Sequence, residues 1–400
     1  MGLNKKDHTM NLHILKQYAK IPFLKLFSLI GLWFRGYFDK ELKKEEIHKI
    51  LIFCLGGIGD NIRLFPIIRA LHEAFPLASF TILIDSANEG FFKLFPGSFF
   101  NFIYFNLYKE HKRLLVKILF SISLRRYRFD LIYNPHRGVG MIEGTIMSGV
   151  IGAPYRIGFT ENGSGFLYTT KIEFKRESPI LRQNIALLKE AGIAINNPNI
   201  EIVIPKEDIL FARGFLKRHN ISEDDLIFCV HPGAYWASKL RCWPLDNFID
   251  LFLQIDLRYK AKIIIIGNRD EVHINNYISE RIKSPNIISS IRDTSIGRMS
   301  TLIKSSHLFI GNDSGPLHIA LALNIPSIGI FGSTSPKQVI SNNSTTFIAI
   351  KKDLPCSPCF VHQALFIPRC DDVRCLNTIS VSEVMDAIDK VLGKHSAFSG

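Results

Sequence analysis

Asp313, Ser314, Gly315 and Pro316 have the types and spacing of an anion-binding helix start. Asp and Ser are typical N-cap residues, and a proline is tolerated in the first turn because its missing N–H is not needed there. Such a start presents free backbone N–H groups and the positive end of the helix dipole, so it can bind a phosphate. The alternative is an ordinary β–α–β unit whose glycines only make tight turns.

A second glycine-rich turn, Gly56-Gly57-Ile58-Gly59-Asp60, follows an apolar run near the start of the chain. A carboxylate there can accept a proton from an attacking hydroxyl, although an Asp in this position is more commonly a helix cap. The turn does not complete a dinucleotide-binding fingerprint, and the sequence contains no P-loop motif.

Two further segments carry charges in places where a nucleotide could bind. The loop 231–244 contains Lys239 and Arg241, either of which could neutralise a diphosphate, beside Trp236 and Trp243. The alternative there is a surface loop with a packed tryptophan. Glu271 closely follows an apolar run and could bind ribose hydroxyls, although a carboxylate at a helix start without any ligand is equally common.

The elements that position these residues form a β/α alternation. Short apolar runs bounded by Gly, Asn and Pro predict buried parallel strands. They lie at Ile50–Leu55, Ser79–Ile84, Phe102–Phe105, Asp130–Tyr133, Leu226–Val230, Lys262–Gly267, Asn286–Ser289, Leu308–Ile310 and Ser327–Phe331. Helices are expected from the Gly56 turn to about Phe75, from about Gly315 to Leu323, and over about Val381–Leu392. Alternation of this kind predicts parallel sheets that bind ligands beyond the carboxyl ends of their strands.

The pattern breaks around Asn196–Asp208, which divides the chain into two halves of similar architecture. We expect an α/β protein with an extension at 1–49, a first doubly wound domain at 50–200, a linker region at 201–225 and a second domain at 226–395. Two facing doubly wound domains with a central cleft are the natural arrangement.

Composition indicates a folded protein with anionic partners. The chain has 400 residues, 47% hydrophobic and 21% charged, and 49 Lys and Arg against 36 Asp and Glu give a net charge of +13. The basic residues are scattered, with Arg125-Arg126-Tyr127-Arg128 as the main cluster, and no nucleic-acid-binding module is present, so we expect no nucleic-acid partner. The start of the chain lacks a signal-peptide layout, and no apolar run is long enough to span a bilayer, so a cytoplasmic location is expected.

The extension combines apolar residues with dispersed cations. Asn11–Phe38 is rich in Leu, Ile and Phe, with Trp33, Tyr37 and several lysines. A basic helix with aromatic anchors is suited to lie on an anionic membrane surface. The alternative is an extra helix packed on the first domain.

The motifs together resemble glycosyltransferase family 9, the ADP-heptose:lipopolysaccharide heptosyltransferases, over about Ile50–Leu392. The resemblance rests on four segments in order: GGIGDNIRLFPIIRAL, HPGAYWASK with a following WP, IIIIGNRDE and FIGNDSGPLHIALALNIPSIGIFGSTSP. It implies a GT-B fold, in which the N-terminal domain holds the acceptor and the C-terminal domain holds the nucleotide-sugar. The implied activity is the inverting transfer of heptose, or a related sugar, from ADP-heptose to a lipopolysaccharide-type core.

The resemblance also implies roles for individual residues. Asp60 is the general base that deprotonates the acceptor hydroxyl. Residues matched to the donor phosphates and nucleotide are Lys239 or Arg241, Glu271 for the ribose, Asp313, Ser314, Gly315 and His318. Fixed donors and a cation would stabilise the charge that grows on the departing diphosphate, so no cofactor or catalytic metal is required.

Two departures from the family pattern leave choices open. Members commonly read S-K-R-W-P, whereas this chain has two extra residues between Ser238 and Trp243, so the phosphate cation is Lys239 or Arg241 depending on the alignment. The acceptor side, with Gly57 and Gly59, also carries His136 and Arg137 in place of the usual triplet. These two residues could contact an anionic acceptor or be structural.

Four cysteines form a cluster in the loop 356–375, at Cys356, Cys359, Cys370 and Cys375. The first pair has the spacing of a zinc site, and four thiolates could close a structural tetrahedral site. Free thiols in an ordered loop are the leading alternative, and the three other cysteines fit a reducing compartment.

The sequence therefore predicts a cytoplasmic enzyme, peripheral on the inner membrane, with an anionic glycolipid acceptor. The alternatives are a GT-B enzyme with another nucleotide-sugar donor, a non-catalytic nucleotide-sugar or nucleic-acid binder, and an epimerase-like GT-B protein that needs no acceptor.

Overall fold

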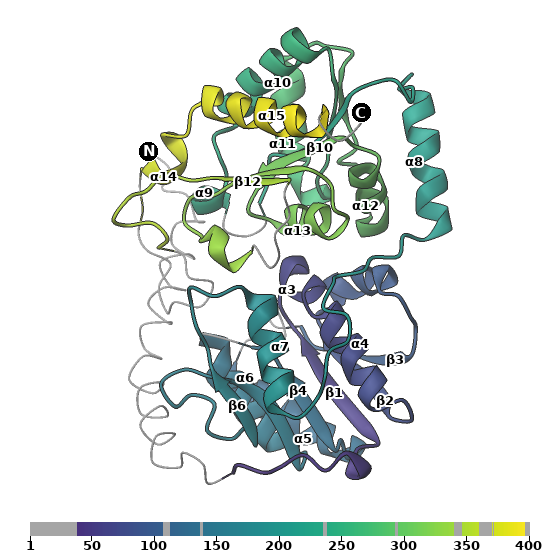
Figure 1. Cartoon of the computed structure of the whole chain (residues 1–400), viewed down its shortest axis with the longest axis vertical. Helices are drawn as coiled ribbons and strands as arrows, with labels where there is room; N and C mark the ends of the chain where they lie inside the picture. The colour runs from purple at the N-terminus through teal and green to yellow at the C-terminus, as the bar shows by residue number, and fades with distance from the viewer. Residues whose placement is uncertain are drawn as a thin grey trace.

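The computed structural model describes residues 38–106, 113–136, 139–234, 238–292, 295–339, 346–359, 370 and 372–396. It consists of two α/β domains, the N-terminal one below and the C-terminal one above in Figure 1. The predicted extension at 1–49 lies mostly outside the described residues; its described end holds a short 3₁₀ helix, η1 (Lys44–Glu46), and the first residue of β1. Among the described residues, no helix has both the length and the apolar character needed to cross a membrane.

The N-terminal domain is built on a six-stranded parallel sheet in the order β3-β2-β1-β4-β5-β6. Its strands are β1 (Lys49–Cys54), β2 (Ser79–Ile84), β3 (Phe100–Tyr104), β4 (Leu131–Asn134), β5 (Tyr155–Thr160) and β6 (Thr170–Glu173). In β1 and β2 every residue after the first is buried, because helices cover both faces of the sheet. The apolar runs of the sequence predicted this feature.

Helices divide between the two faces of this sheet. They are α3 (Ile58–Ile62), α4 (Phe65–Ala74), α5 (Leu114–Leu124), α6 (Val139–Ile151) and α7 (Ile180–Glu190), with 3₁₀ helices η2 (Ser86–Leu94) and η3 (Arg125–Tyr127). Alternate β1 residues pack in different clusters: Ile50 and Ile52 with α4 and α7, and Leu51 and Phe53 with α5 and α6. The predicted helix from the glycine turn to Phe75 is in fact two helices, since α3 ends before Arg63 and α4 begins at Phe65.

The C-terminal domain repeats the architecture in a second six-stranded parallel sheet, in the order β12-β11-β10-β7-β8-β9. Its strands are β7 (Ile227–His231), β8 (Lys262–Ile265), β9 (Ile287–Ser289), β10 (Leu308–Asn312), β11 (Ser327–Ile330) and β12 (Phe347–Ile350). Its helices are α9 (Ser238–Arg241), α10 (Leu245–Tyr259), α11 (Val272–Arg281), α12 (Ile296–Lys304), α13 (Gly315–Ala322), α14 (Arg374–Asn377) and α15 (Val381–Ser396), with η4 (Arg269–Glu271) and η5 (Pro336–Gln338). The closing helix α15 packs within this domain, where Val384 and Ile388 join the buried cluster of the sheet.

Both sheets reverse their strand order at the same place. In the first sheet the order turns between β1 and β4, and in the second between β7 and β10. Ligands of doubly wound sheets bind outside the carboxyl ends of the strands at this switch point. The segments that follow these four strands are therefore the ones that the fold places at a binding site.

The region 201–225, predicted as a linker, contains a helix of its own, α8 (Lys206–Arg218). This helix packs on α12 of the C-terminal domain (Figure 1). The Arg298 guanidinium lies 4.4 Å from the centre of the Phe211 ring, and the Ser295 hydroxyl donates to the Asp208 carboxylate at 3.5 Å. The predicted linker is thus partly a helix that packs against the C-terminal domain.

Candidate active site between the two domains

The glycine turn after β1 places Asp60 in the short helix α3. Gly57 is the N-cap of this helix. The side-chain amide of Asn61 donates to the Gly56 carbonyl at 3.2 Å, which fixes the turn. The Asp60 carboxylate accepts from Arg63 Nη1 at 3.2 Å. Its side chain is 33% exposed whereas that of Arg63 is 7% exposed, so a buried guanidinium holds a carboxylate that solvent can still reach.

Arg63 also reaches across to the second domain. Its Nη2 lies 3.1 Å from Nε2 and 3.2 Å from Nδ1 of His318 on α13. A guanidinium can only donate, so the imidazole accepts. Burial, followed by the positive charge of Arg63, lowers the pKa of His318 to about 3, although Asp313 and Asp60 oppose the shift. His318 is therefore a neutral acceptor at physiological pH.

Helices α3 and α13 meet at two glycines with little space between their backbones. A Cβ on Gly59 would lie 2.6 Å from Nε2 and 2.9 Å from Cγ of His318. A Cβ on Gly315 would lie 3.0 Å from Cβ of Ile58. Gly59, predicted on the acceptor side, thus also forms the contact between the domains.

Arg241 contacts the turn that follows β10. Its Nη2 donates to the Asp313 carboxylate at 2.9 Å and also to the Asp313 backbone carbonyl. Its buried Nε has no hydrogen-bond partner within the described part of the chain. Of the two cations that the sequence left open, the structure thus places Arg241 at this turn, while the side chain of Lys239 lies outside the described residues.

The same turn is held from the other side by His231, which ends β7. Its Nδ1 lies 2.9 Å from the hydroxyl of Ser314, the N-cap residue of α13, and its Nε2 lies 3.3 Å from the Glu271 carboxylate. Because the Ser314 hydroxyl pairs with His231, the start of α13 carries no side-chain cap among the described residues. The first backbone N–H groups of α13 are therefore not occupied by the Ser314 side chain.

Glu271 occupies a closed position. Its carboxylate accepts from the backbone N–H of Asn268 at 2.8 Å, and a Cβ on Gly267 would lie 2.9 Å from its Oε2. Burial acts to raise the pKa of Glu271, but the hydrogen bond and charge of His231, together with the Asn268 N–H, outweigh it and leave the pKa below its usual range. Glu271 is thus a buried carboxylate that orients His231, and its predicted contact with ribose stays a prediction.

On the acceptor side, His136 follows β4, the strand beside β1 at the switch point. Its Nδ1 and backbone N lie 2.9 and 3.0 Å from the Asn134 side-chain carbonyl, and its ring meets Phe53 edge-on at 6.3 Å. His136 therefore lies at the same edge of the sheet as the glycine turn. Arg137 lies outside the described residues.

The cysteine cluster carries no metal geometry. Cys375 is buried, and burial followed by the nearby thiols of Cys359, Cys370 and Cys356 raises its pKa to about 11. Across the described ranges, no group of three or more His, Cys, Asp or Glu side chains is arranged to hold a metal ion. Among the described residues, the seven cysteines form no disulfide bond. The geometry thus gives the structural-metal hypothesis no support.

Three residues of the site were not identified from the sequence. Arg63 and His231 carry the two hydrogen-bond networks, and Asn312 ties the loop to the turn by accepting from Trp243 N at 3.0 Å and donating to the Pro232 carbonyl at 2.8 Å. His231 and Asn312 come just after predicted strands, and Arg63 comes just after the short helix that the glycine turn begins; those positions were the signal available. Their partners lie far away in the sequence, so spacing alone could not reveal the pairs.

Comparison with known proteins agrees with this architecture. Residues 120–368 match glycosyltransferase family 9 (heptosyltransferase). A Campylobacter coli protein named lipopolysaccharide heptosyltransferase 1 is 32% identical over 361 residues, which cover 86% of this chain and 99% of the relative.

Solved structures share the fold. A family 9 glycosyltransferase from Veillonella parvula has a TM-score of 0.71 at 18% identity, with 89% of this chain and 99% of that one covered. An E. coli heptosyltransferase solved with ADP-2-deoxy-2-fluoro heptose has a TM-score of 0.60 at 15% identity, with 86% and 99% covered. Two parallel six-stranded sheets in one chain are the two Rossmann-like domains of a GT-B fold. The chain belongs to glycosyltransferase family 9 and is a glycosyltransferase enzyme.

Proposed function

We propose that the enzyme transfers heptose from ADP-heptose to the core of a lipopolysaccharide or lipooligosaccharide, with inversion at the transferred carbon. Family membership and the printed names of its relatives support this substrate class. The observation that carries the proposal is the Arg63 bridge, which joins Asp60 of one domain to His318 of the other. The Asp60 carboxylate and the helix α13, which begins at the turn after β10, thereby belong to one hydrogen-bond network.

In the proposed reaction Asp60 is the general base. The acceptor hydroxyl attacks the anomeric carbon of heptose, its proton passes to the Asp60 carboxylate, and the bond from that carbon to the diphosphate oxygen breaks. ADP leaves with the bonding electrons. The partial exposure of Asp60 suits this role, because a base must reach the substrate hydroxyl. Arg63 keeps the carboxylate oriented.

The turn after β10 is the proposed site of the leaving diphosphate. Ser314, Gly315 and the start of α13 supply backbone N–H groups and the positive helix end, and Arg241 supplies a full charge beside Asp313. His231 fixes the Ser314 hydroxyl, so the donors are ordered before the substrate arrives. Because the His318 ring is neutral, it adds no second positive charge beside Arg63. Negative charge that grows on the diphosphate would thus meet fixed donors.

The acceptor is expected beyond the carboxyl ends of β1 and β4. Gly57, His136 and Arg137 follow these strands and would contact its anionic core. The net charge of +13 favours an anionic glycolipid. We place the enzyme at the cytoplasmic face of the inner membrane, where such an acceptor is anchored.

The direct test is ADP release from ADP-heptose, measured with and without a truncated core glycolipid. The proposal predicts release that depends on the acceptor and a much slower reaction with UDP-N-acetylglucosamine at the same concentration. Turnover with another nucleotide-sugar and none with ADP-heptose would keep the fold and refute the donor. Release that does not depend on any acceptor would refute transfer.

A further inference from the structure

Helix α5 turns an unusual set of side chains toward the protein. Lys117, Ser121 and Leu124, spaced i, i+4 and i+7, are buried against the sheet and α6. Lys117 pairs with Glu143 of α6, and the Ser121 hydroxyl donates to the Lys117 carbonyl at 2.8 Å. A lysine and a serine thus occupy the side on which a surface helix normally carries apolar residues.

The outward side of α5 is correspondingly apolar. Leu115 is 66% exposed, Leu119 56% and Ile122 47%, and they follow the same i, i+4, i+7 spacing. Because residues at this spacing share a helix face, the three side chains form one stripe. Half-buried side chains flank the stripe. The helix thus carries apolar residues on its exposed side and a lysine and a serine on its buried side, the reverse of an ordinary surface helix.

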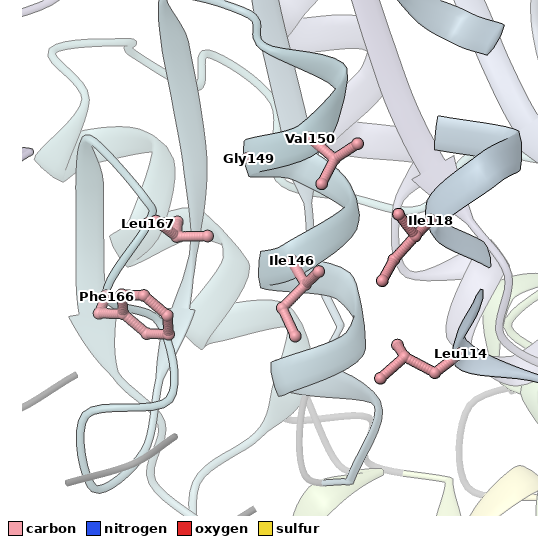
Figure 2. Close-up of a pocket in the computed structure, with 7 residues that line it drawn as sticks. All are labelled: Leu114, Ile118, Ile146, Gly149, Val150, Phe166 and Leu167. Atoms are coloured by element: carbon pink, nitrogen blue, oxygen red, sulfur yellow. The ribbon is translucent and has the colours of Figure 1, made fainter. Parts of the chain in front are cut away.

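An apolar groove of about 400 Å³ continues this surface. Figure 2 shows Leu114 and Ile118 of α5 on one side of α6, and Phe166 and Leu167 on the other. The groove is lined by Leu114, Ile118, Ile146, Gly149, Val150, Phe166 and Leu167. The stripe and the groove together form a broad apolar area on one side of the N-terminal domain.

Arginines border the stripe at both ends. Arg113 precedes α5, and Arg125, Arg126 and Arg128 follow it, all exposed. Tyr127 is 38% exposed, and the Arg126 guanidinium lies 5.0 Å from the centre of its ring. We call the stripe, Tyr127 and these four arginines the α5 surface.

We propose that the α5 surface docks the enzyme on an anionic membrane. The stripe would enter the boundary between headgroups and acyl chains, while the arginines contact lipid phosphates. Tyr127, with its apolar ring and polar hydroxyl, suits the same boundary. This inference deepens the proposed function, on which it rests for the reason to approach a membrane, and it assigns that approach to a defined surface of the folded domain.

Charge argues against two other partners for the α5 surface, a second copy of the chain and the chain's own residues 1–37. A second copy of the chain would set arginines against arginines, and such like charges oppose association. Residues 1–37 hold six Lys and Arg but a single acidic residue, Asp7, so they too would be repelled. An anionic lipid surface is complementary to both the apolar and the basic parts.

The test is co-sedimentation of the full chain with phosphatidylglycerol vesicles and with phosphatidylcholine vesicles, without donor or acceptor. The change is the triple variant Leu115→Ser, Leu119→Ser and Ile122→Ser. The matched control is Leu253→Ser with Leu257→Ser on α10, which removes leucines that are 48% and 83% exposed. We expect the triple variant to lose at least about ten-fold in partitioning to anionic vesicles, and the control to lose nothing.

A second variant, Arg125→Ala, Arg126→Ala and Arg128→Ala, tests the charge part independently, with an expected loss of at least about ten-fold that disappears at high salt. Both variants should keep wild-type ADP release with a soluble acceptor, which separates a failure of docking from a failure of transfer. Three results would overturn the proposal: equal partitioning of both variants and wild type, equal binding to both vesicle types, or a wild-type dimer that the triple variant converts to a monomer.

Discussion

Substituting Gly59 by alanine should disturb the contact that joins the two domains. The new Cβ would lie 2.6 Å from Nε2 and 2.9 Å from Cγ of His318, whereas carbon atoms in contact are normally about 3.5–4.0 Å apart. Cδ2 of the ring would be closer still, so the ring would have to move by more than about 1 Å, against its 3.1 Å contact with Arg63. Overpacking of this kind lowers the free energy of unfolding by about 1–3 kcal/mol. Because the clash falls on the ring that Arg63 joins to Asp60, acceptor-dependent ADP release should fall as well.

The assay is acceptor-dependent ADP release, with thermal unfolding measured in parallel. The matched control is Gly90→Ala in the same domain, where an added Cβ meets nothing within 4 Å. A second check is the pair Gly59→Ala and His318→Ala. Because the smaller side chain removes the clash, the double variant should be no slower than His318→Ala alone. Equal activity and equal thermal stability of Gly59→Ala and Gly90→Ala would show that the contact between α3 and α13 tolerates the added Cβ.

Three more predictions concern ionisable side chains with little exposure to solvent. Arg241→Ala should weaken ADP-heptose binding, measured by calorimetry, by about 10- to 100-fold because a charged hydrogen-bond donor is lost, and Lys239→Ala should weaken it less; the reverse order would contradict the assignment. His318, with its pKa lowered from 6.5 to about 3, binds no proton in the folded protein where the unfolded chain does, so the folded protein loses stability as the pH falls below about 6.5. His318→Gln lacks this titration, so the difference in free energy of unfolding between wild type and variant should shrink from about pH 7 to about pH 5; a constant difference in urea unfolding would contradict a neutral His318. Lys117→Ala should destabilise the protein by about 1–3 kcal/mol, because the half-buried Glu143 loses the charged hydrogen bond from Lys117, and Lys117→Met with Glu143→Gln should recover most of that loss.

The central strands could be predicted from the sequence because they are buried on both faces. Three strands were not expected: β5, and the half-buried β6 and β12 at the sheet edges. The expected strand Ser79–Ile84 matches β2, and the expected helix from Gly315 to Leu323 matches α13 within one residue. Local signals were available for two errors. Pro66 lies in the first turn of α4, which marks a new helix, and Pro205 with acidic residues in the following turn marks the start of α8.

The site was predictable only in part, since its contacts depend on how the domains meet. Asp60, Asp313 and Ser314 could be selected because each follows a strand at a switch point. The partnership of Arg63 with His318 joins residues 255 positions apart and appears only after both domains have folded and docked. The α5 surface was likewise hidden, because an apolar helix gives no indication in sequence of which side faces the core.

The most direct test of the account is the substitution Asp60→Asn, which keeps the shape of the side chain and removes its capacity to take a proton. If Asp60 is the general base, acceptor-dependent ADP release should fall by about 10²- to 10⁴-fold. Binding of ADP-heptose should remain as in the wild type, since the donor-side residues Arg241 and Ser314 are untouched. Wild-type turnover by Asp60→Asn would contradict the assignment of Asp60 as the general base, and so would a loss of activity that is fully explained by weaker donor binding.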